Sequence, residues 1–175
     1  SLVGIVDADA GLFGGDPRAI EKTFNLLQQV GGRAGRGKKF GKVLLQTYFP
    51  DQQIIKSIQL RERQKFTERA LEERKNFNIP PFGYMTAIII SSHTKSLASK
   101  FASKLVQISN NDENIKVLGP VEAPISLLRG QYRYRILIKG NNRKNINNLT
   151  KKIVQHSKLP SSVKLIIDVD PYSFM

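Results

Sequence analysis

The pattern of apolar and polar positions predicts an α/β arrangement in the first third of the chain. A continuous apolar run at residues 2–6 predicts a strand buried on both faces of a parallel sheet. Asp16 followed by Pro17 predicts the start of a helix. The next apolar residues share one helical face: Ile20, Phe24, Leu27 and Val30. A strand at residues 43–48 and a short helix at 50–57 complete an α/β unit.

A highly charged segment separates this unit from the rest of the chain. Residues 60–77 interleave basic and acidic side chains around few apolar ones, which predicts a solvated connecting helix. Pro80 and Pro81 end that helix, because proline cannot continue the backbone hydrogen bonding. We therefore divide the chain into residues 1–58, a connecting segment at 59–81 and a second domain at 82–175.

The second domain has a regular alternation of predicted elements. Strands are expected at 84–92, 115–118, 132–139 and 163–169, and helices at 97–109 and 143–156. The order βαββαβ predicts an α+β ferredoxin-like sandwich, with four strands and both helices on one face.

Charge points to a polyanionic partner. The 175 residues include 28 Lys and Arg against 14 Asp and Glu, a net charge of +14, so nucleic acid is the first candidate and an anionic membrane surface the second. The absence of cysteine excludes disulfides and thiolate metal sites, and two separated histidines build no metal site alone. No apolar run approaches the roughly 20 residues of a membrane span, so we expect a soluble cytosolic protein. The abrupt apolar start without methionine predicts the C-terminal piece of a longer protein.

A glycine-rich basic segment lies between the first helix and the second strand. Residues 32–39 approach the phosphate-loop pattern, but Lys39 replaces the hydroxyl that would hold magnesium, and the loop follows a helix instead of a strand. Read from Gln29 to Arg36 as Q-V-G-G-R-A-G-R, the segment offers an amide and two guanidinium groups around small residues. Each planar guanidinium group can donate two hydrogen bonds to the oxygens of a triphosphate. The alternative is a basic glycine-rich loop that binds nothing in particular.

This motif resembles motif VI of superfamily 2 helicases. Residues 6–13, 29–37 and 43–47 together resemble the end of the second RecA-like lobe in the primosomal protein N′ (PriA) family. The resemblance continues through residues 79–83, 118–120, 123–124, 128–130, 132–133 and 168–171, and so covers nearly the whole chain.

The resemblance implies a bacterial, cytoplasmic, ATP-dependent DNA helicase that unwinds 3′ to 5′ and starts primosome assembly at stalled replication forks. Gln29 would couple the nucleotide site to lobe movement, while Arg33 and Arg36 would reach the γ-phosphate, with Arg36 as the arginine finger. ATP and magnesium would be held mainly by parts outside these residues. The family's zinc has no ligands here, and without Walker motifs this chain alone is predicted to be inactive. Asp7 and Asp9 are assigned structural or loop-capping roles.

Positive charge is concentrated in the second domain. Between Ala123 and Ile167 there are ten basic residues and no acidic residue. The predicted nucleic-acid contacts are Arg129, Arg133, Arg135, Lys139 and Lys144. Tyr132 and Tyr134 alternate with the arginines, so they lie on the opposite face of their strand. An open tyrosine face could stack bases; a covered face makes the tyrosines core residues, which we favour, leaving Arg133 and Arg135 on the open face.

Partners follow from the same residues. Branched and single-stranded DNA are expected, and the family resemblance adds single-stranded-DNA-binding protein and primosome proteins. Arg143 most simply belongs to a helix cap at Asn141 and Asn142, or alternatively receives an acidic peptide such as the tail of that binding protein. The rival interpretation of the whole chain is a non-enzymatic module that binds DNA or RNA. The first unit of the chain could also pair with a second copy through an exposed sheet edge.

Overall fold

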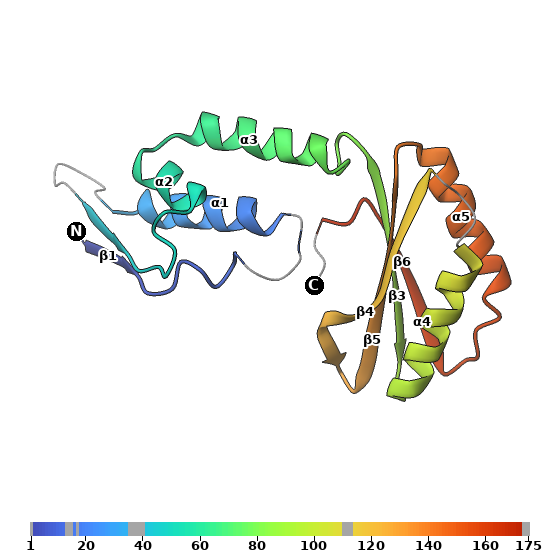
Figure 1. The fold of residues 1–175 in the computed structure, drawn as a ribbon. Helices are drawn as coiled ribbons and strands as arrows, with labels where there is room; N and C mark the ends of the chain where they lie inside the picture. The colour runs from blue at the N-terminus through green and yellow to red at the C-terminus, as the bar shows by residue number, and fades with distance from the viewer. Residues whose placement is uncertain (1, 13–15, 17, 35–40, 110–113, 173–175) are drawn as a thin grey trace. The chain divides into compact units, whose positions relative to one another are not determined.

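The computed structural model describes residues 2–12, 16, 18–34, 41–109 and 114–172. The chain divides into two compact units, Ser1–Glu73 and Arg74–Met175. The elements of the first unit are β1 (Leu2–Ile5), α1 (Ala19–Gly31), β2 (Lys42–Leu45) and α2 (Gln53–Gln59). A single helix, α3 (Arg63–Asn76), begins in the first unit and ends in the second (Figure 1).

The first unit packs two helices and α3 on a small parallel sheet. β1 pairs with β2 in parallel from Leu2 opposite Lys42 to Ile5 opposite Leu45. The core contains the following buried residues: Ala8, Phe24, Leu27, Ile54 and Ile55. Phe66 of α3 stacks on Phe24 of α1 with ring centroids 3.8 Å apart and planes 7° apart, which fixes α3 on α1.

Two expectations about the first unit are wrong in detail. β1 alternates between exposed and half-buried positions, and Leu2 is 64% exposed, because the described core covers only one face of the sheet. The helix begins at Ala19 with Arg18 as its N-cap, not at Asp16. Asp16 instead accepts hydrogen bonds from the Arg18 amide at 2.9 Å and from Lys22 Nζ at 2.7 Å. Ile20 is 44% exposed, and Pro17 lies outside the described residues.

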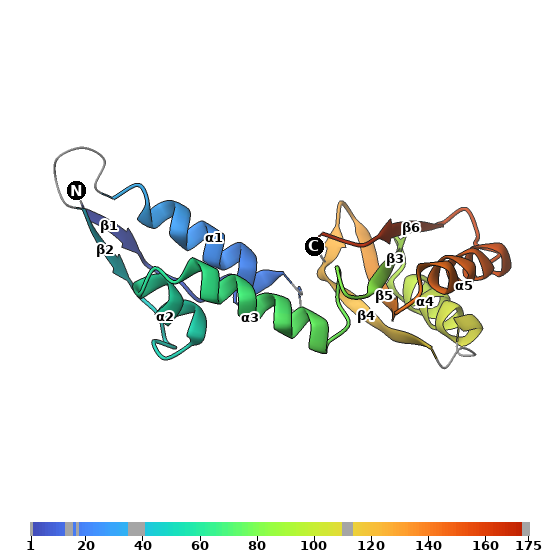
Figure 2. The same ribbon diagram turned by 90° about the horizontal axis from the view of Figure 1, so that it is seen from above.

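The second unit is a four-stranded antiparallel sheet with two helices. Its elements are β3 (Tyr84–Ser92), α4 (Lys95–Ser109), β4 (Ile115–Leu128), β5 (Gln131–Gly140), α5 (Arg143–His156) and β6 (Val163–Val169). The strand order is β4-β5-β3-β6, and every neighbouring pair is antiparallel. Both helices cover the same face of the sheet (Figures 1 and 2). The expected α+β class is confirmed, and β3, α5 and β6 have the expected bounds.

The main core lies between this sheet and its two helices. Alternate residues of the central strands point into it, including Ile88, Ile90, Ile136 and Ile138, each 0% exposed. Leu105 of α4 and Ile153 of α5 close the core from the helix side. Apolar residues recur at every second position of these strands and at every third or fourth position of the helices, so both sets face the same core layer.

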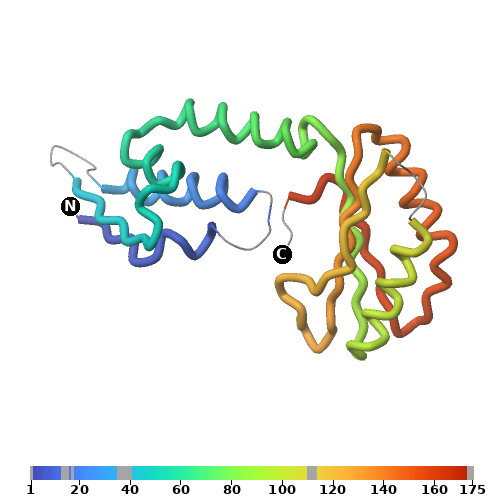
Figure 3. The backbone as a smooth tube through the Cα atoms, in the orientation of Figure 1, coloured from blue at the N-terminus to red at the C-terminus, as the bar shows by residue number. Residues whose placement is uncertain are grey.

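β4 is much longer than the expected strand at 115–118. Its pairing with β5 shifts register after Leu118 and again after Glu122, then resumes with Leu127 opposite Tyr132. Figure 3 shows the backbone of this second half bending out of the sheet before it returns in β5. Gly119 adopts a φ of +104°, and a Cβ there would lie 2.7 Å from the Arg135 carbonyl oxygen. The expected strand ended at Leu118, whereas the edge strand continues through Gly119 and Pro120 with register irregularities.

Candidate nucleotide-loop and nucleic-acid sites

The residues of the predicted nucleotide loop follow the C-terminal end of α1. Gln29 lies in the last turn of the helix and is exposed. Arg33 lies just beyond the helix, where its backbone amide donates to the Val30 carbonyl at 3.1 Å, and it is also exposed. Arg36 lies outside the described residues. The structure thus places Gln29 in the last turn of α1 and Arg33 two residues beyond the helix end, with the helix anchored by the buried Phe24.

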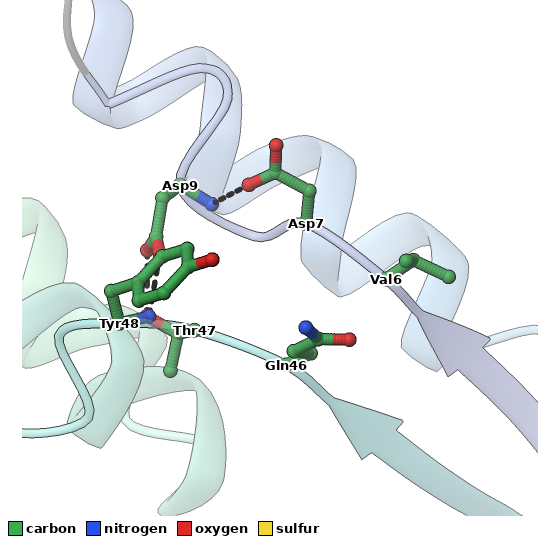
Figure 4. Close-up of a pocket in the computed structure, with 6 residues that line it drawn as sticks. All are labelled: Val6, Asp7, Asp9, Gln46, Thr47 and Tyr48. Carbon is green, nitrogen blue, oxygen red and sulfur yellow. Dashed lines mark hydrogen bonds between the residues drawn. The ribbon is translucent and has the colours of Figure 1, made fainter.

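A shallow pocket lies at the carboxyl ends of β1 and β2. It has a volume of about 190 Å³ and is lined by Val6, Asp7, Asp9, Gln46, Thr47 and Tyr48 (Figure 4). Asp9 is only 7% exposed and accepts from the Thr47 hydroxyl at 2.6 Å and from the Tyr48 amide at 2.7 Å. Asp7 Oδ1 accepts from the Asp9 and Ala10 amides, each at 3.0 Å. The loop-capping roles expected for both aspartates are confirmed.

Removing the Asp9 carboxylate should therefore destabilise the first unit. Asp9→Ala leaves the Thr47 hydroxyl and the Tyr48 amide without their acceptor, at a cost of about 1 to 3 kcal/mol in the free energy of unfolding. Asp51→Ala is the matched control. That side chain is 92% exposed and, among the residues the structure describes, forms an ion pair with Lys56 alone, so its loss should cost under about 1 kcal/mol. Urea denaturation measures both values. Equal effects of the two substitutions would contradict a structural role for Asp9.

The described residues offer no metal centre. Within them, no group of three or more His, Asp or Glu side chains could hold an ion. Each helix in the part of the chain with assigned structure is also too short or too polar to cross a bilayer.

The cations of β5 are more engaged than their alternation suggested. Arg135 is 6% exposed, so its expected place on an open face is wrong. Alternation still puts Arg135 on the face opposite Ile136 and Ile138. However, β5 is a central strand with β4 and β3 on either side, and the side chain is covered there. Arg133 is half-buried, and its Nη1 donates to the Ile125 carbonyl at 3.4 Å.

Lys139 is likewise held by the fold. Its Nζ donates to the Phe77 carbonyl at 2.6 Å. Burial lowers the pKa of Lys139, and the neighbouring charge of Lys116 lowers it further. Arg129 differs, because it lies exposed in the turn between β4 and β5 with a φ of 51°. Of the four predicted contacts from the turn to the end of β5, Arg129 alone is exposed.

The burial of the β5 tyrosines decides whether their face is open for base stacking or covered as part of the core. Tyr134 packs against the main core, so its interpretation as a core residue is confirmed. Its hydroxyl donates to Glu122 Oε1 at 3.3 Å. Tyr132 is half-buried.

Glu122 also joins the long strand to the start of α4. Lys95 Nζ lies 2.7 Å from Glu122 Oε1. The hydrogen bond from Lys95 lowers the pKa of Glu122, and the same bond raises the pKa of Lys95. Because the carboxyl pKa is depressed in the folded state, any stability from this pair is present above the ordinary pKa of glutamate and is lost as the pH falls through the lowered value.

The two predicted residues at the start of α5 differ in their surroundings. Lys144 is exposed, and its backbone amide donates to Asn142 Oδ1 at 2.9 Å, which confirms Asn142 as the cap. Arg143 Nη2 lies 2.7 Å from Asp170 Oδ2, and the guanidinium stands 4.9 Å from the Tyr84 ring centre. Arg143 thus already holds a carboxylate from its own chain.

Sequence reasoning missed the basic residues of α4. This helix carries Lys95, Lys100 and Lys104 and contains no acidic residue. Counting acidic and basic residues helix by helix, as was done for residues 123–167, would have identified these lysines.

Residues 75–172 match the family described as "Primosomal protein N C-terminal domain". The chain is 42% identical over 174 residues to "Replication restart protein PriA" of Rickettsia prowazekii, covering 99% of this chain and 27% of that protein. The proteins of the same name from Bacillus subtilis and Haemophilus influenzae are 34% and 33% identical, with 100% and 98% of this chain and 22% and 24% of their own lengths covered. The chain therefore spans about a quarter of the length of these relatives.

Proposed function

The chain belongs to the primosomal protein N (PriA) family, and we propose that it forms the C-terminal part of an ATP-dependent DNA helicase. This helicase recognises stalled replication forks, unwinds DNA 3′ to 5′ and starts primosome assembly. The single observation that carries the proposal is sequence similarity along almost the whole chain to proteins named for replication restart. A non-enzymatic binding module is less favoured, because the similarity to proteins named for replication restart extends over nearly the whole chain.

We assign the first unit to the end of the second RecA-like lobe. The parallel pair β1 and β2 with helices α1 and α2 supports this assignment, since such lobes are built from parallel strands joined by helices. In that setting Gln29, Arg33 and Arg36 occupy the positions of motif VI. Gln29 couples the nucleotide site to lobe movement, and the two arginines neutralise charge on the transferred phosphoryl group, with Arg36 as the finger.

We assign the second unit to a ferredoxin-like domain that helps to hold branched DNA. The order βαββαβ and the strand order β4-β5-β3-β6 support the fold assignment. The net charge of +14 supports DNA as the ligand, because a basic surface attracts the phosphate backbone.

The metals of the family do not fit the residues of this chain. The chain has no cysteine, and the described residues bring together no three His, Asp or Glu side chains. We therefore assign neither zinc nor magnesium ligands among these residues. The expectation that the chain by itself does not hydrolyse ATP rests on its lack of Walker motifs.

The proposed setting is the bacterial cytoplasm, with primosome proteins and single-stranded-DNA-binding protein as partners. Arg143 is the candidate for an acidic peptide. Since Asp170 occupies its guanidinium at 2.7 Å, such a peptide has to displace that carboxylate.

Strand separation by the intact helicase tests the proposed function. Two partial duplexes are compared, one with a 3′ single-stranded tail on the loading strand and one with a 5′ tail. We expect ATP-dependent unwinding of the 3′-tailed substrate alone. Binding to both substrates without ATP-dependent unwinding would support the non-enzymatic module instead.

A further inference from the structure

The two helices of the second unit form a surface of one charge sign. α4 and α5 lie on the same face of the sheet (Figures 1 and 2). Together they contain six lysines and one arginine, and neither helix contains an aspartate or glutamate. A helix face on an ordinary soluble domain mixes both signs, so this segregation requires an explanation.

The lysines point away from the core. In α5 the buried residues are Ile146, Thr150 and Ile153, which face the sheet. Lys144 and Lys151 are two turns apart and lie on the opposite side of the helix, and both are exposed. In α4, Lys100 and Lys104 are four residues apart and exposed, opposite the buried Ala98, Ala102 and Leu105.

Few of these cations are compensated within the fold. Lys95 pairs with Glu122 and Arg143 pairs with Asp170. The other five have no ion pair with any described residue: Lys100, Lys104, Lys144, Lys151 and Lys152. We call these five residues the helix-face lysines. Their charges are therefore available to a ligand, unlike those of Arg133, Arg135 and Lys139 on β5.

Neutral donors accompany the helix-face lysines. Asn147, Asn148 and Gln155 are exposed on α5 and can donate to phosphate oxygens. The 14 residues of α5 extend over about 21 Å, which exceeds the roughly 12 Å width of a DNA major groove. A duplex lying along this helix can therefore present phosphates of both strands to it.

We propose that the helix-face lysines of α4 and α5 form the principal contact surface for the DNA phosphate backbone in this domain. The proposal rests on the proposed DNA-binding function. It keeps Lys144 from the contacts expected from sequence and replaces those of β5 with residues of the helix layer. Recognition is by charge and is independent of base sequence, since lysine and amide donors aimed at phosphates carry no base readout.

The test compares two triple variants of the intact helicase on a forked DNA at several salt concentrations. The helix-face variant carries Lys104→Gln, Lys144→Gln and Lys151→Gln. The matched control carries Lys75→Gln, Lys116→Gln and Lys164→Gln, which removes the same charge from exposed positions on α3, β4 and β6. Glutamine has nearly the helix propensity of lysine, so both helices are retained, and circular dichroism checks this.

We expect the slope of log affinity against log salt to become shallower by about 2 to 3 in the helix-face variant and by less than about 1 in the control. In a second helix-face variant, Lys100→Gln with Lys152→Gln, the same slope should become shallower by about 1 to 2. The proposal is overturned if the helix-face variant keeps the slope of the unmodified protein, or if both triple variants change the slope equally. Either outcome leaves the proposed fork binding itself unaffected. Failure of the unmodified protein to bind the fork overturns the proposed function as well.

Discussion

Arg36→Ala in the intact helicase should reduce DNA-stimulated ATP hydrolysis by about 10³ to 10⁵, the effect of an arginine finger in nucleotide hydrolases. The guanidinium acts on charge that develops only in the transition state, so its loss lowers turnover more than nucleotide binding. Fork affinity should stay within a few fold, because the helix-face lysines are unchanged. Steady-state ATPase rates and fork titrations on the same preparation measure the two effects.

Lys42→Gln is the control for this experiment. Lys42 lies, like Arg36, in residues 22–50, which contain no acidic residue. It is exposed on β2 and is not part of the motif. Its variant should keep the ATPase rate within a few fold. Parallel loss of ATP hydrolysis and fork binding in Arg36→Ala would indicate that the arginine loop contacts nucleic acid, as the non-enzymatic module requires.

Ile136→Ala should strongly destabilise the second unit. Ile136 is 0% exposed and lies at the centre of the main core, between β4 and β3. Truncation of a fully buried isoleucine leaves a cavity in addition to the lost burial, for a total of about 2 to 5 kcal/mol. Hydrogen exchange at the amides of β3 and β5 reports the opening free energy of this unit.

Ile166→Ala is the comparison for Ile136→Ala. Ile166 lies on the edge strand β6 and is 42% exposed, so its truncation should cost under about 1 kcal/mol. An Ile136→Ala loss below that of Ile166→Ala would show that the main core is not where the structure places it.

The second unit was more predictable from sequence than the first because its apolar patterns agree with the packing that the structure shows. Strands such as Tyr84–Ser92 and helices such as Arg143–His156 have periodic apolar faces that pack on one another, so local pattern and tertiary structure agree. β1 has the apolar composition of a strand buried on both sides, yet Leu2 is exposed. Composition reports what a strand could bury, whereas the exposure depends on what lies over it.

The candidate sites show a similar division. The order of glycine and arginine between Gln29 and Arg36 is a local property, and the sequence alone was sufficient to identify it. The accessibility of a cation is not local. Arg135 and Lys144 belong to the same acid-free stretch, but Arg135 stands between two neighbouring strands while Lys144 lies on the outer face of a helix. Burial on a central strand and exposure on a helix are tertiary properties, which the local sequence does not report.

ATP hydrolysis by the intact protein, measured with and without forked DNA, tests the central claim most directly. If the chain completes a DNA-dependent motor, the fork should raise the rate severalfold, and Arg36→Ala should remove that rate. A protein that binds the fork tightly, yet hydrolyses no ATP in its presence, would contradict the account.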